Sequence, residues 1–177
     1  MRKLTNDELN RKSIQEFKAS GKSPFLIVLD NVRSLNNIGS IFRSADAFLV
    51  EAVWLCGITA TPPHREIHKS ALGATESVDW KYYDNTVSAV KELLEQGYIV
   101  IAVEQTDGSV PLDRFVPEAG KKYALVFGHE IKGVSEEVVH MSDVCVEIPQ
   151  YGTKHSFNVA VSTGIVLWEL AGRTRAH

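Results

Sequence analysis

Apolar runs of strand length alternate with helical segments along this chain, and this alternation restricts the folds that the chain can adopt. The first run, Phe25–Leu29, is apolar at every position, which is typical of a parallel strand covered on both faces. Further strand-like runs lie at 52–56, 78–83, 98–103, 123–127 and 144–148, and no Asn-Gly hairpin signal stands between successive runs. The sequence therefore predicts an α/β fold, with a mostly parallel sheet of about six strands flanked by helices.

Size and composition fit a single globular domain. The chain has 177 residues, of which 44% are hydrophobic and 23% are charged, and this suffices for a full core without disulfides or a metal. No apolar run is long enough to cross a membrane, and the amino terminus lacks the apolar segment of a signal peptide. Cys56 and Cys145 lie within strand-like runs and are expected to be buried free thiols. These features predict a cytoplasmic protein without membrane contact.

The first 22 residues form a predicted helical extension, and residues 23–177 form the predicted domain. Thr5 and Glu8 have the spacing of a capping box, so a helix is expected from there to about Ala19. Six basic and three acidic side chains give this segment a net charge of +3, which leaves −6 for the remainder. Such a segment is either an RNA-facing patch or a solvated helix face with mixed charges.

The last predicted helix, 158–171, is apolar around most of its circumference. A helix of this kind is buried on several sides. Ala160 and Gly164 also leave a groove of small residues where another helix could approach closely. Part of this apolar surface is expected to lack a partner within the chain. We therefore expect a homodimer contact through this helix.

Polar loops follow several predicted strands, at the end of the sheet where ligands bind in open α/β folds. The first loop leads into a helix that carries Asn36 and Arg43, and a helix start of this kind attracts an anion such as a phosphate. Two alternatives remain. Asn36 or Asn37 could simply cap the helix, and Arg43 could pair with Asp46 or Glu51.

Two more polar loops complete the predicted ligand site. Gly128–Gly133 contains one carboxylate, Glu130, between two glycines; the alternative is a plain turn in which Ser135 caps the next helix. The loop at 152–158 places Ser156 and Asn158 at the start of the last helix. Each signal is weak alone, whereas their order and spacing together are specific.

Several common catalytic motifs are missing from the sequence, including the phosphate-binding P-loop, Gly-x-Gly-x-x-Gly and Gly-x-Ser-x-Gly. His64 and His68 are four residues apart, as in a zinc-binding helix, but no glutamate directly follows the first histidine. A surface pair is the better interpretation, and no metal is expected.

The three polar blocks resemble motifs 1, 2 and 3 of the SpoU/TrmH family of RNA ribose 2'-O-methyltransferases, in the SPOUT superfamily. The resemblance covers about residues 24–171 and departs from the common pattern at Gln150, Phe157 and Ala160. The blocks are Asn36-x-x-Gly39-x-x-x-Arg43-x-Ala45, Phe127-Gly128-x-Glu130-x-x-Gly133-Val134-Ser135 and Ile148-Pro149-x-x-Gly152-x-x-x-Ser156-Phe157-Asn158-Val159.

This resemblance implies an enzyme that uses S-adenosylmethionine, releases S-adenosylhomocysteine and binds the cofactor in a carboxy-terminal trefoil knot. It also implies a dimer with the site at the interface. Residues at the family's catalytic and substrate-orienting positions are Asn36, Arg43, Glu130, Ser156 and Asn158. Residues at its cofactor-binding positions are Val103, Glu104, Gln105, Gly128, Ile148 and Phe157.

The expected reaction transfers a methyl group to a ribose 2'-hydroxyl of structured RNA. The family's usual mechanism gives the base role to the counterpart of Arg43. Because a guanidinium stays protonated, chemistry favours Arg43 as a phosphate ligand and a stabiliser of alkoxide charge. The chain shows no separate RNA-binding domain, so a compact substrate such as tRNA is slightly preferred over rRNA. Two rival interpretations are a non-catalytic RNA-binding protein that retains the fold and a nucleotide-binding regulatory domain.

Overall fold

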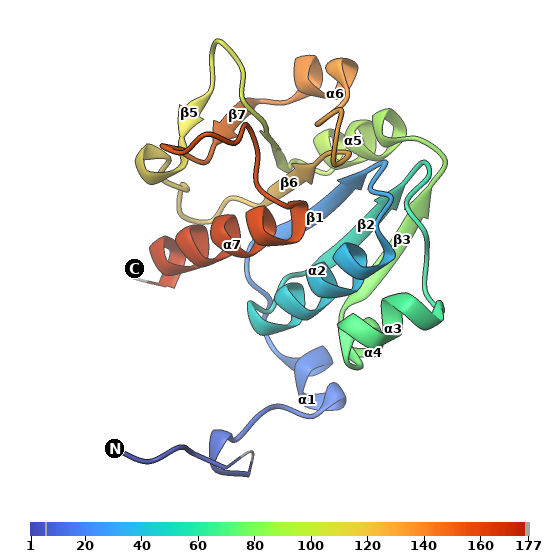
Figure 1. The fold of residues 1–177 in the computed structure, drawn as a ribbon, viewed down its shortest axis with the longest axis vertical. Coiled ribbons are helices and arrows are strands. Elements are labelled where there is room, and N and C mark those ends of the chain that lie inside the picture. Colours follow the sequence, from blue (N-terminus) through green and yellow to red (C-terminus); the bar gives the residue numbers. More distant parts are fainter. Residues whose placement is uncertain (6, 176–177) are drawn as a thin grey trace.

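The computed structural model describes residues 1–5 and 7–175, and its centre is a parallel β-sheet (Figure 1). The prediction of an α/β fold is confirmed, with seven strands in place of about six, in the order β3-β2-β1-β6-β4-β7-β5. Every neighbouring pair is parallel. The strands are β1 (Phe25–Asp30), β2 (Ala52–Cys56), β3 (Asp79–Tyr83), β4 (Ile99–Val103), β5 (Val110–Pro111), β6 (Tyr123–Phe127) and β7 (Val144–Glu147).

Helices cover both faces of the sheet, because alternate residues of the central strands point to opposite sides. In β1, Phe25, Ile27 and Leu29 pack on one core layer, and Leu26 and Val28 pack on the other. The first layer lies under α2 (Leu35–Ala47), α3 (Arg65–Ala71), α4 (Ala74–Ser77) and α7 (Val159–Arg175), and the second under α5 (Thr86–Glu95) and α6 (Glu136–Met141).

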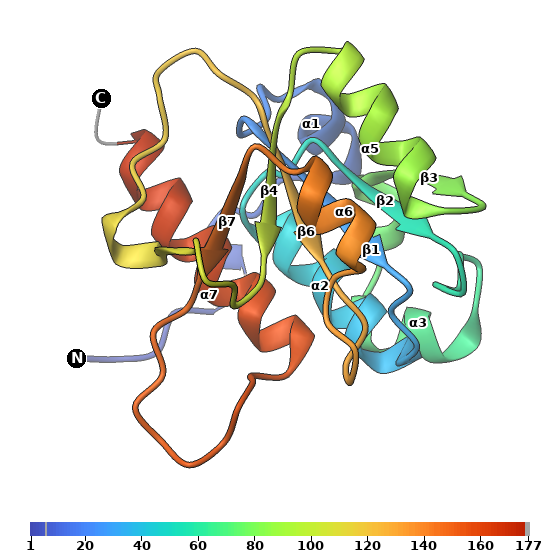
Figure 2. The ribbon, with the colours of Figure 1, turned by 90° about the horizontal axis from the view of Figure 1, so that it is seen from above.

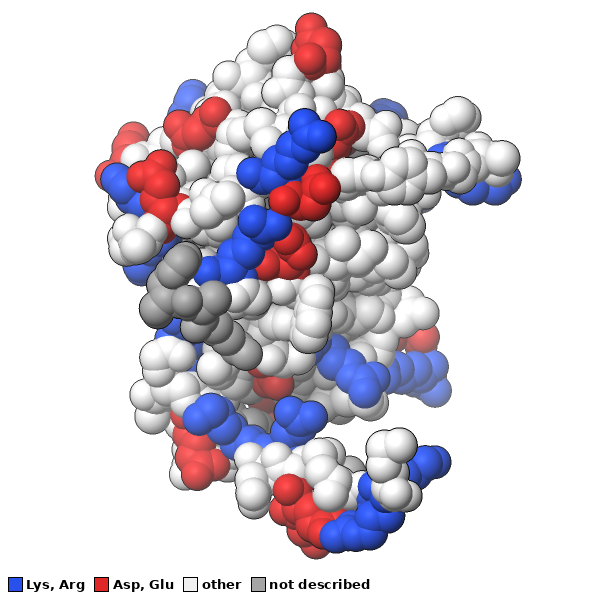
Figure 3. Space-filling view, turned by 90° about the vertical axis from the view of Figure 1, so that its left-hand side faces the viewer, with Lys and Arg blue, Asp and Glu red and all other residues white. Residues whose placement is uncertain are grey.

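The amino-terminal extension differs from the prediction. A short 3-10 helix, Asp7–Leu9, ends at Asn10, whose φ of 47° is left-handed, and α1 covers only Ile14–Ala19. The capping box that starts α1 is formed by Ser13 and Glu16. The expected continuous helix from Thr5 is therefore wrong, since a left-handed residue cannot continue an α-helix. Basic and acidic side chains both reach solvent on this lower part of the molecule (Figure 3). Another 3-10 turn, η2 (Leu112–Arg114), follows β5.

The strand order places several loops of distant sequence together. The chain builds β1, β2 and β3 outward in one direction, and β6 then fills the position between β1 and β4. The carboxyl ends of β1, β6, β4 and β7 therefore lie at the same edge of the sheet. The loop between β7 and α7 and the loop after β6 both project from the body there (Figure 2). The trefoil knot stays a prediction of the family resemblance.

Helix α7 buries one face and exposes another. Val166, Leu167 and Leu170 are buried in the core, whereas Val161 and Trp168 are 49% and 73% exposed. The exposed pair is seven residues apart and so lies on one side of the helix. The ring of Trp168 also packs edge-on against Phe48 of the same chain, with ring centroids 6.4 Å apart. Among the described residues, no helix combines the length and apolar character needed to cross a membrane.

We expect the thiol of Cys56 to be unreactive in the folded protein. Its side chain is fully buried, and burial raises its pKa to about 12, with a smaller opposing effect of Thr86. Since the thiolate is the reactive form, Ellman's reagent at pH 8 should label Cys56 only after unfolding. A Cys145→Ser variant isolates this thiol, and rapid labelling of that variant in its native state would contradict the expectation.

Candidate active site

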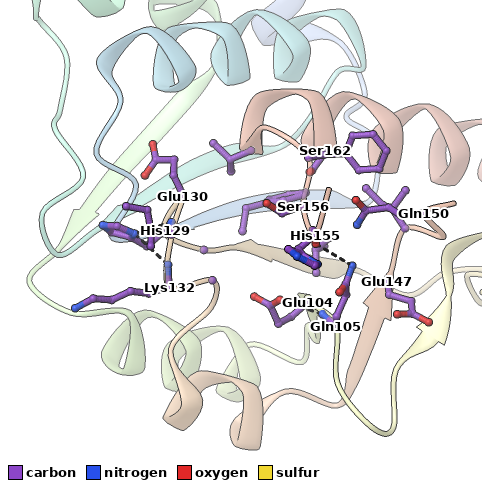
Figure 4. Close-up of a pocket in the computed structure, with 18 of the residues that line it drawn as sticks. Glu104, Gln105, His129, Glu130, Lys132, Glu147, Gln150, His155, Ser156 and Ser162 are labelled. Atoms are coloured by element: carbon purple, nitrogen blue, oxygen red, sulfur yellow. Dashed lines mark hydrogen bonds between the residues drawn. The ribbon is translucent and has the colours of Figure 1, made fainter. Parts of the chain in front are cut away.

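A cavity of about 310 Å³ opens at the carboxyl ends of β4, β6 and β7 (Figure 4). All six residues predicted to bind the cofactor line it, as do Glu130 and Ser156 of the predicted catalytic set. Asn36, Arg43 and Asn158 are not part of its lining. The lining also includes side chains that the sequence did not single out, namely His129, Lys132, Glu147, His155 and Ser162.

The loop after β6 is closed by tight backbone contacts. The His129 N–H donates to the Gly133 carbonyl at 3.0 Å, and the Gly133 N–H donates back at 2.8 Å. A Cβ on Gly128 would lie 2.0 Å from the carbonyl carbon of Gly133, and Gly133 itself has a φ of 70°. Both glycines are therefore required by close approach or by backbone conformation.

Gly128→Ala is expected to lower the free energy of unfolding by about 1–3 kcal/mol, because the new methyl group would strike backbone that cannot move aside. Urea denaturation measures this change. Gly21→Ala is the matched control, since a Cβ at Gly21 meets nothing within 4 Å. Equal stability of the two variants would contradict the expectation.

Two carboxylates from neighbouring strands hold the end of this loop. Glu104, after β4, accepts the Val134 N–H at 2.9 Å. Asp30, the last residue of β1, is 1% exposed and accepts the Ser135 N–H at 2.7 Å. Asp30 also accepts the hydroxyl of Thr86 at 2.5 Å, so this buried carboxylate is well supplied with donors. These contacts fasten the loop on both sides of β6.

Glu130 reaches in the opposite direction, toward the loop after β1. Its carboxylate accepts the backbone N–H groups of Ser34 at 2.9 Å and Arg33 at 3.1 Å. Burial acts to raise the pKa of Glu130, but hydrogen bonds from Ser34, Arg33 and Asn37 outweigh it, and the pKa lies below its ordinary value. Glu130 is therefore an ionised acceptor near neutral pH. The ionised Glu130 carboxylate stabilises the folded state above a pH of about 4.3. This stabilisation is lost as the pH falls through the lower pKa that Glu130 has in the folded protein.

Asn37 joins the second and third polar blocks. Its Oδ1 accepts the side-chain amide of Asn158 at 3.1 Å, and its own amide approaches the Glu130 carboxylate at 3.5 Å. Asn36, the residue chosen from the sequence, is exposed, and its carbonyl accepts the hydroxyl of Ser70. Neither asparagine caps α2, whose N-cap is Ser34. The two asparagines thus have different partners, and the site role of Asn36 stays a prediction.

Arg43 lies apart from the cavity. It is exposed on α2, beside a depression formed with Lys12, Phe17 and Leu72. Arg43 is seven positions after Asn36, so both are on one side of the helix, about 10 Å apart along its axis. Among the described residues, no ion pair involves Arg43: Asp46 accepts the Ser77 hydroxyl, and Glu51 pairs with Lys122.

The structure also shows what Ser135 and His64 do. Ser135 occupies the N-cap of α6 without a side-chain capping bond. His64 caps α3, because its Nδ1 accepts the Glu66 N–H at 3.2 Å. Within the described residues, no group of three or more His, Cys, Asp or Glu side chains could hold a metal ion.

The sequence and the structure match known RNA methyltransferases. A 23S rRNA (guanosine-2'-O-)-methyltransferase RlmB from Vibrio vulnificus is 31% identical over 162 residues, which are 92% of this chain and 64% of that protein. A tRNA (guanosine(18)-2'-O)-methyltransferase from Aquifex aeolicus is 31% identical over 166 residues, which are 92% of this chain and 75% of that protein. The chain thus spans somewhat less than two thirds of the length of the Vibrio vulnificus enzyme.

Solved structures give the same result. The AdoMet-bound rRNA methyltransferase of Sinorhizobium meliloti has a TM-score of 0.79 and 28% identity, covering 89% of this chain and 59% of its own. The A. aeolicus TrmH/SpoU tRNA modifying enzyme has a TM-score of 0.80 and 28% identity, covering 92% and 82%. The model of the SpoU rRNA Methylase family matches residues 24–168. The chain therefore belongs to the SpoU rRNA methylase family.

Proposed function

We propose that this chain transfers the methyl group of S-adenosylmethionine to a ribose 2'-hydroxyl of structured RNA. The observation that carries the proposal is one cavity lined by the second and third polar blocks, to which Asn37 of the first block is hydrogen-bonded. Glu130 and Ser156 line that cavity, and Asn37 links Glu130 to Asn158 by side-chain hydrogen bonds. The related enzymes named above methylate 23S rRNA or tRNA at 2'-O positions.

The charged side chains that line the cavity suit S-adenosylmethionine. Glu104 and Glu147 line it, and their carboxylates complement a ligand that carries sulfonium and ammonium groups. We propose that backbone groups of Gly128, Ile148 and Phe157, with Val103 and Gln105, hold the adenosine. When bound, the cofactor supplies a methyl group already activated on a sulfonium.

The chain's own residues then have to orient the RNA and dispose of one proton. The bound cofactor would supply the methyl group to the ribose 2'-oxygen, and the hydroxyl proton would pass to a neighbouring RNA phosphate or to water. We assign Arg43 to the RNA phosphate and to the developing alkoxide charge. Ser156 and Asn158 are proposed to orient the ribose. Glu130 is proposed to support this site by holding the loop after β1, since its oxygens already accept two backbone amides.

We propose that the active form is a homodimer through α7. Supporting this, Val161 and Trp168 expose apolar surface along one side of α7, which packs beside α2. Arg43 is exposed and does not line its own cavity. We propose that it serves the cavity of a partner chain that packs against α7 and α2. Both cysteines are free, in keeping with a reducing cytoplasm, which we propose as the location.

The decisive test incubates the protein with methyl-labelled S-adenosylmethionine and, separately, with bulk tRNA and bulk rRNA lacking the modification. A labelled, alkali-resistant dinucleotide is expected, because 2'-O-methylation protects the adjacent phosphodiester bond. The slight preference for tRNA predicts that tRNA accepts more label. If calorimetry finds no S-adenosylmethionine binding and neither RNA is labelled, the chain is an RNA-binding or regulatory protein that retains the fold.

A further inference from the structure

Two large apolar side chains stand exposed on the loops that border the cavity. Tyr151, in the middle of the loop between β7 and α7, is 96% exposed, and Ile131, in the loop after β6, is 86% exposed. Ile148 and Phe157 at the two ends of the first loop line the cavity, whereas Tyr151 does not. The folded chain therefore makes little use of the Tyr151 ring. Figure 2 shows both loops projecting on the same side of the molecule.

The two loops, 128–135 and 148–158, contain two lysines and one glutamate, a net charge of +1, although the whole protein carries −3. The stretch between Glu147 and Glu169 contains no acidic residue and includes Lys154 and His155. The loop after β6 presents Lys132, while the only acid in it, Glu130, points to the amides of Arg33 and Ser34. An exposed aromatic ring, with exposed lysines on the same loop and on the neighbouring loop, fits single-stranded nucleic acid, whose bases stack and whose phosphates are anionic.

We propose that Tyr151 is the platform on which an unpaired base of the RNA stacks, with Lys154 and Lys132 binding the adjoining phosphates. This inference rests on the proposed function and deepens it, since it places the nucleotides beside the cavity that would hold the methyl donor. Stacking on a ring tolerates any base, so Tyr151 contributes affinity and position, with little discrimination among sequences.

Binding of bulk tRNA and bulk rRNA, measured by filter retention at constant salt, tests the stacking. Tyr151→Ala should weaken RNA binding roughly tenfold and raise the KM for RNA by a similar factor. Tyr151→Phe should stay close to the parent protein, because the ring is retained. The rate at saturating RNA and the affinity for S-adenosylmethionine should not change. Tyr82→Ala, an exposed tyrosine on the edge strand β3, is the control.

Salt dependence tests the lysines. Lys154→Ala should lower the slope of log affinity against log salt by about one, the change expected from one lost phosphate contact. Lys121→Ala removes an equal charge from the loop before β6, at the amino ends of the strands and so at the end of the sheet opposite the cavity. This variant should leave the slope unchanged.

Three outcomes separate the hypotheses. Unchanged RNA affinity of Tyr151→Ala would overturn the stacking proposal. A change in sedimentation coefficient of Tyr151→Ala would also overturn it, because the ring would then contact a second copy of the chain. If the parent protein bound RNA through Tyr151 but transferred no methyl group, the stacking proposal would stand and the proposed catalytic function would fall.

Discussion

Arg43→Ala should reduce the rate of methyl transfer by at least about 10²-fold, since loss of one charge-stabilising donor at a reaction centre typically has this effect. The affinity for S-adenosylmethionine should stay within twofold, because Arg43 does not line the cavity. Arg43→Lys should recover little, since an ammonium cannot reproduce the planar, two-pronged geometry of a guanidinium.

Single-turnover methylation and calorimetry together measure the two quantities. Arg65→Ala is a suitable control, because Arg65 is likewise an exposed arginine, at the start of α3 and away from the cavity. A parental rate for Arg43→Ala would remove Arg43 from the mechanism. A large loss of cofactor affinity would mean that its effect is on binding.

Mixing two inactive variants would show whether Arg43 acts across the proposed dimer. If Arg43 serves the partner's cavity, an Arg43→Ala protomer paired with an Asn158→Ala protomer contains one complete site. Random exchange of subunits should then restore about one quarter of the parental activity. If each cavity used its own Arg43, every site in the mixture would lack one residue and no activity would return.

The second large effect is expected for Trp168→Glu. An unpaired carboxylate placed in an apolar interface should weaken dimerisation at least about 10²-fold, because the charge loses its hydration without gaining a partner. Methyl transfer should fall with the dimer fraction and recover at high protein concentration. Sedimentation velocity and activity, measured over the same concentration series, report both.

Trp80→Glu is the matched control, since Trp80 is 38% exposed on the edge strand β3, far from α7 in the sheet order. Trp168→Glu also removes the contact between Trp168 and Phe48, so thermal unfolding should be recorded for the parent protein and both variants. A Trp168→Glu protein that sedimented like the parent protein would show that α7 is not the interface.

The sequence predicted the architecture well because burial of a parallel sheet leaves a strong local signal. Runs such as Phe25–Leu29 and Tyr123–Phe127 are apolar on both faces, and both form central strands. The two-residue strand β5 was missed, because Val110–Pro111 is too short for any periodicity to appear. The strand order could not be predicted from the sequence, because the position of β6 between β1 and β4 depends on contacts between segments distant in the sequence.

Local signals failed where two similar patterns competed. Thr5–Glu8 and Ser13–Glu16 both have capping-box spacing, and only the second starts an α-helix. In the first, the Glu8 carboxylate accepts the Thr5 N–H, but the chain then turns left-handed at Asn10. At the start of α2, Asn37 makes the hydrogen bonds to the other polar blocks, whereas the site role of Asn36 stays a prediction. Adjacent helical residues differ by about 100° in direction, which spacing along the sequence does not reveal.

The loop after β6 combines a rigid base with a free tip. Gly128 and Gly133 meet backbone to backbone, and Glu104 and Asp30 hold the amides that follow. Ile131 and Lys132, at the tip, are exposed and form part of the cavity rim. For protein engineering, this arrangement separates the residues that hold the loop in shape from the residues that can contact RNA. Changes at Ile131 would also reach the cavity that we propose for the methyl donor, because Ile131 lines it. A randomised library at Tyr151, which is exposed and outside the cavity lining, should alter which RNA is bound without altering the site of the methyl donor.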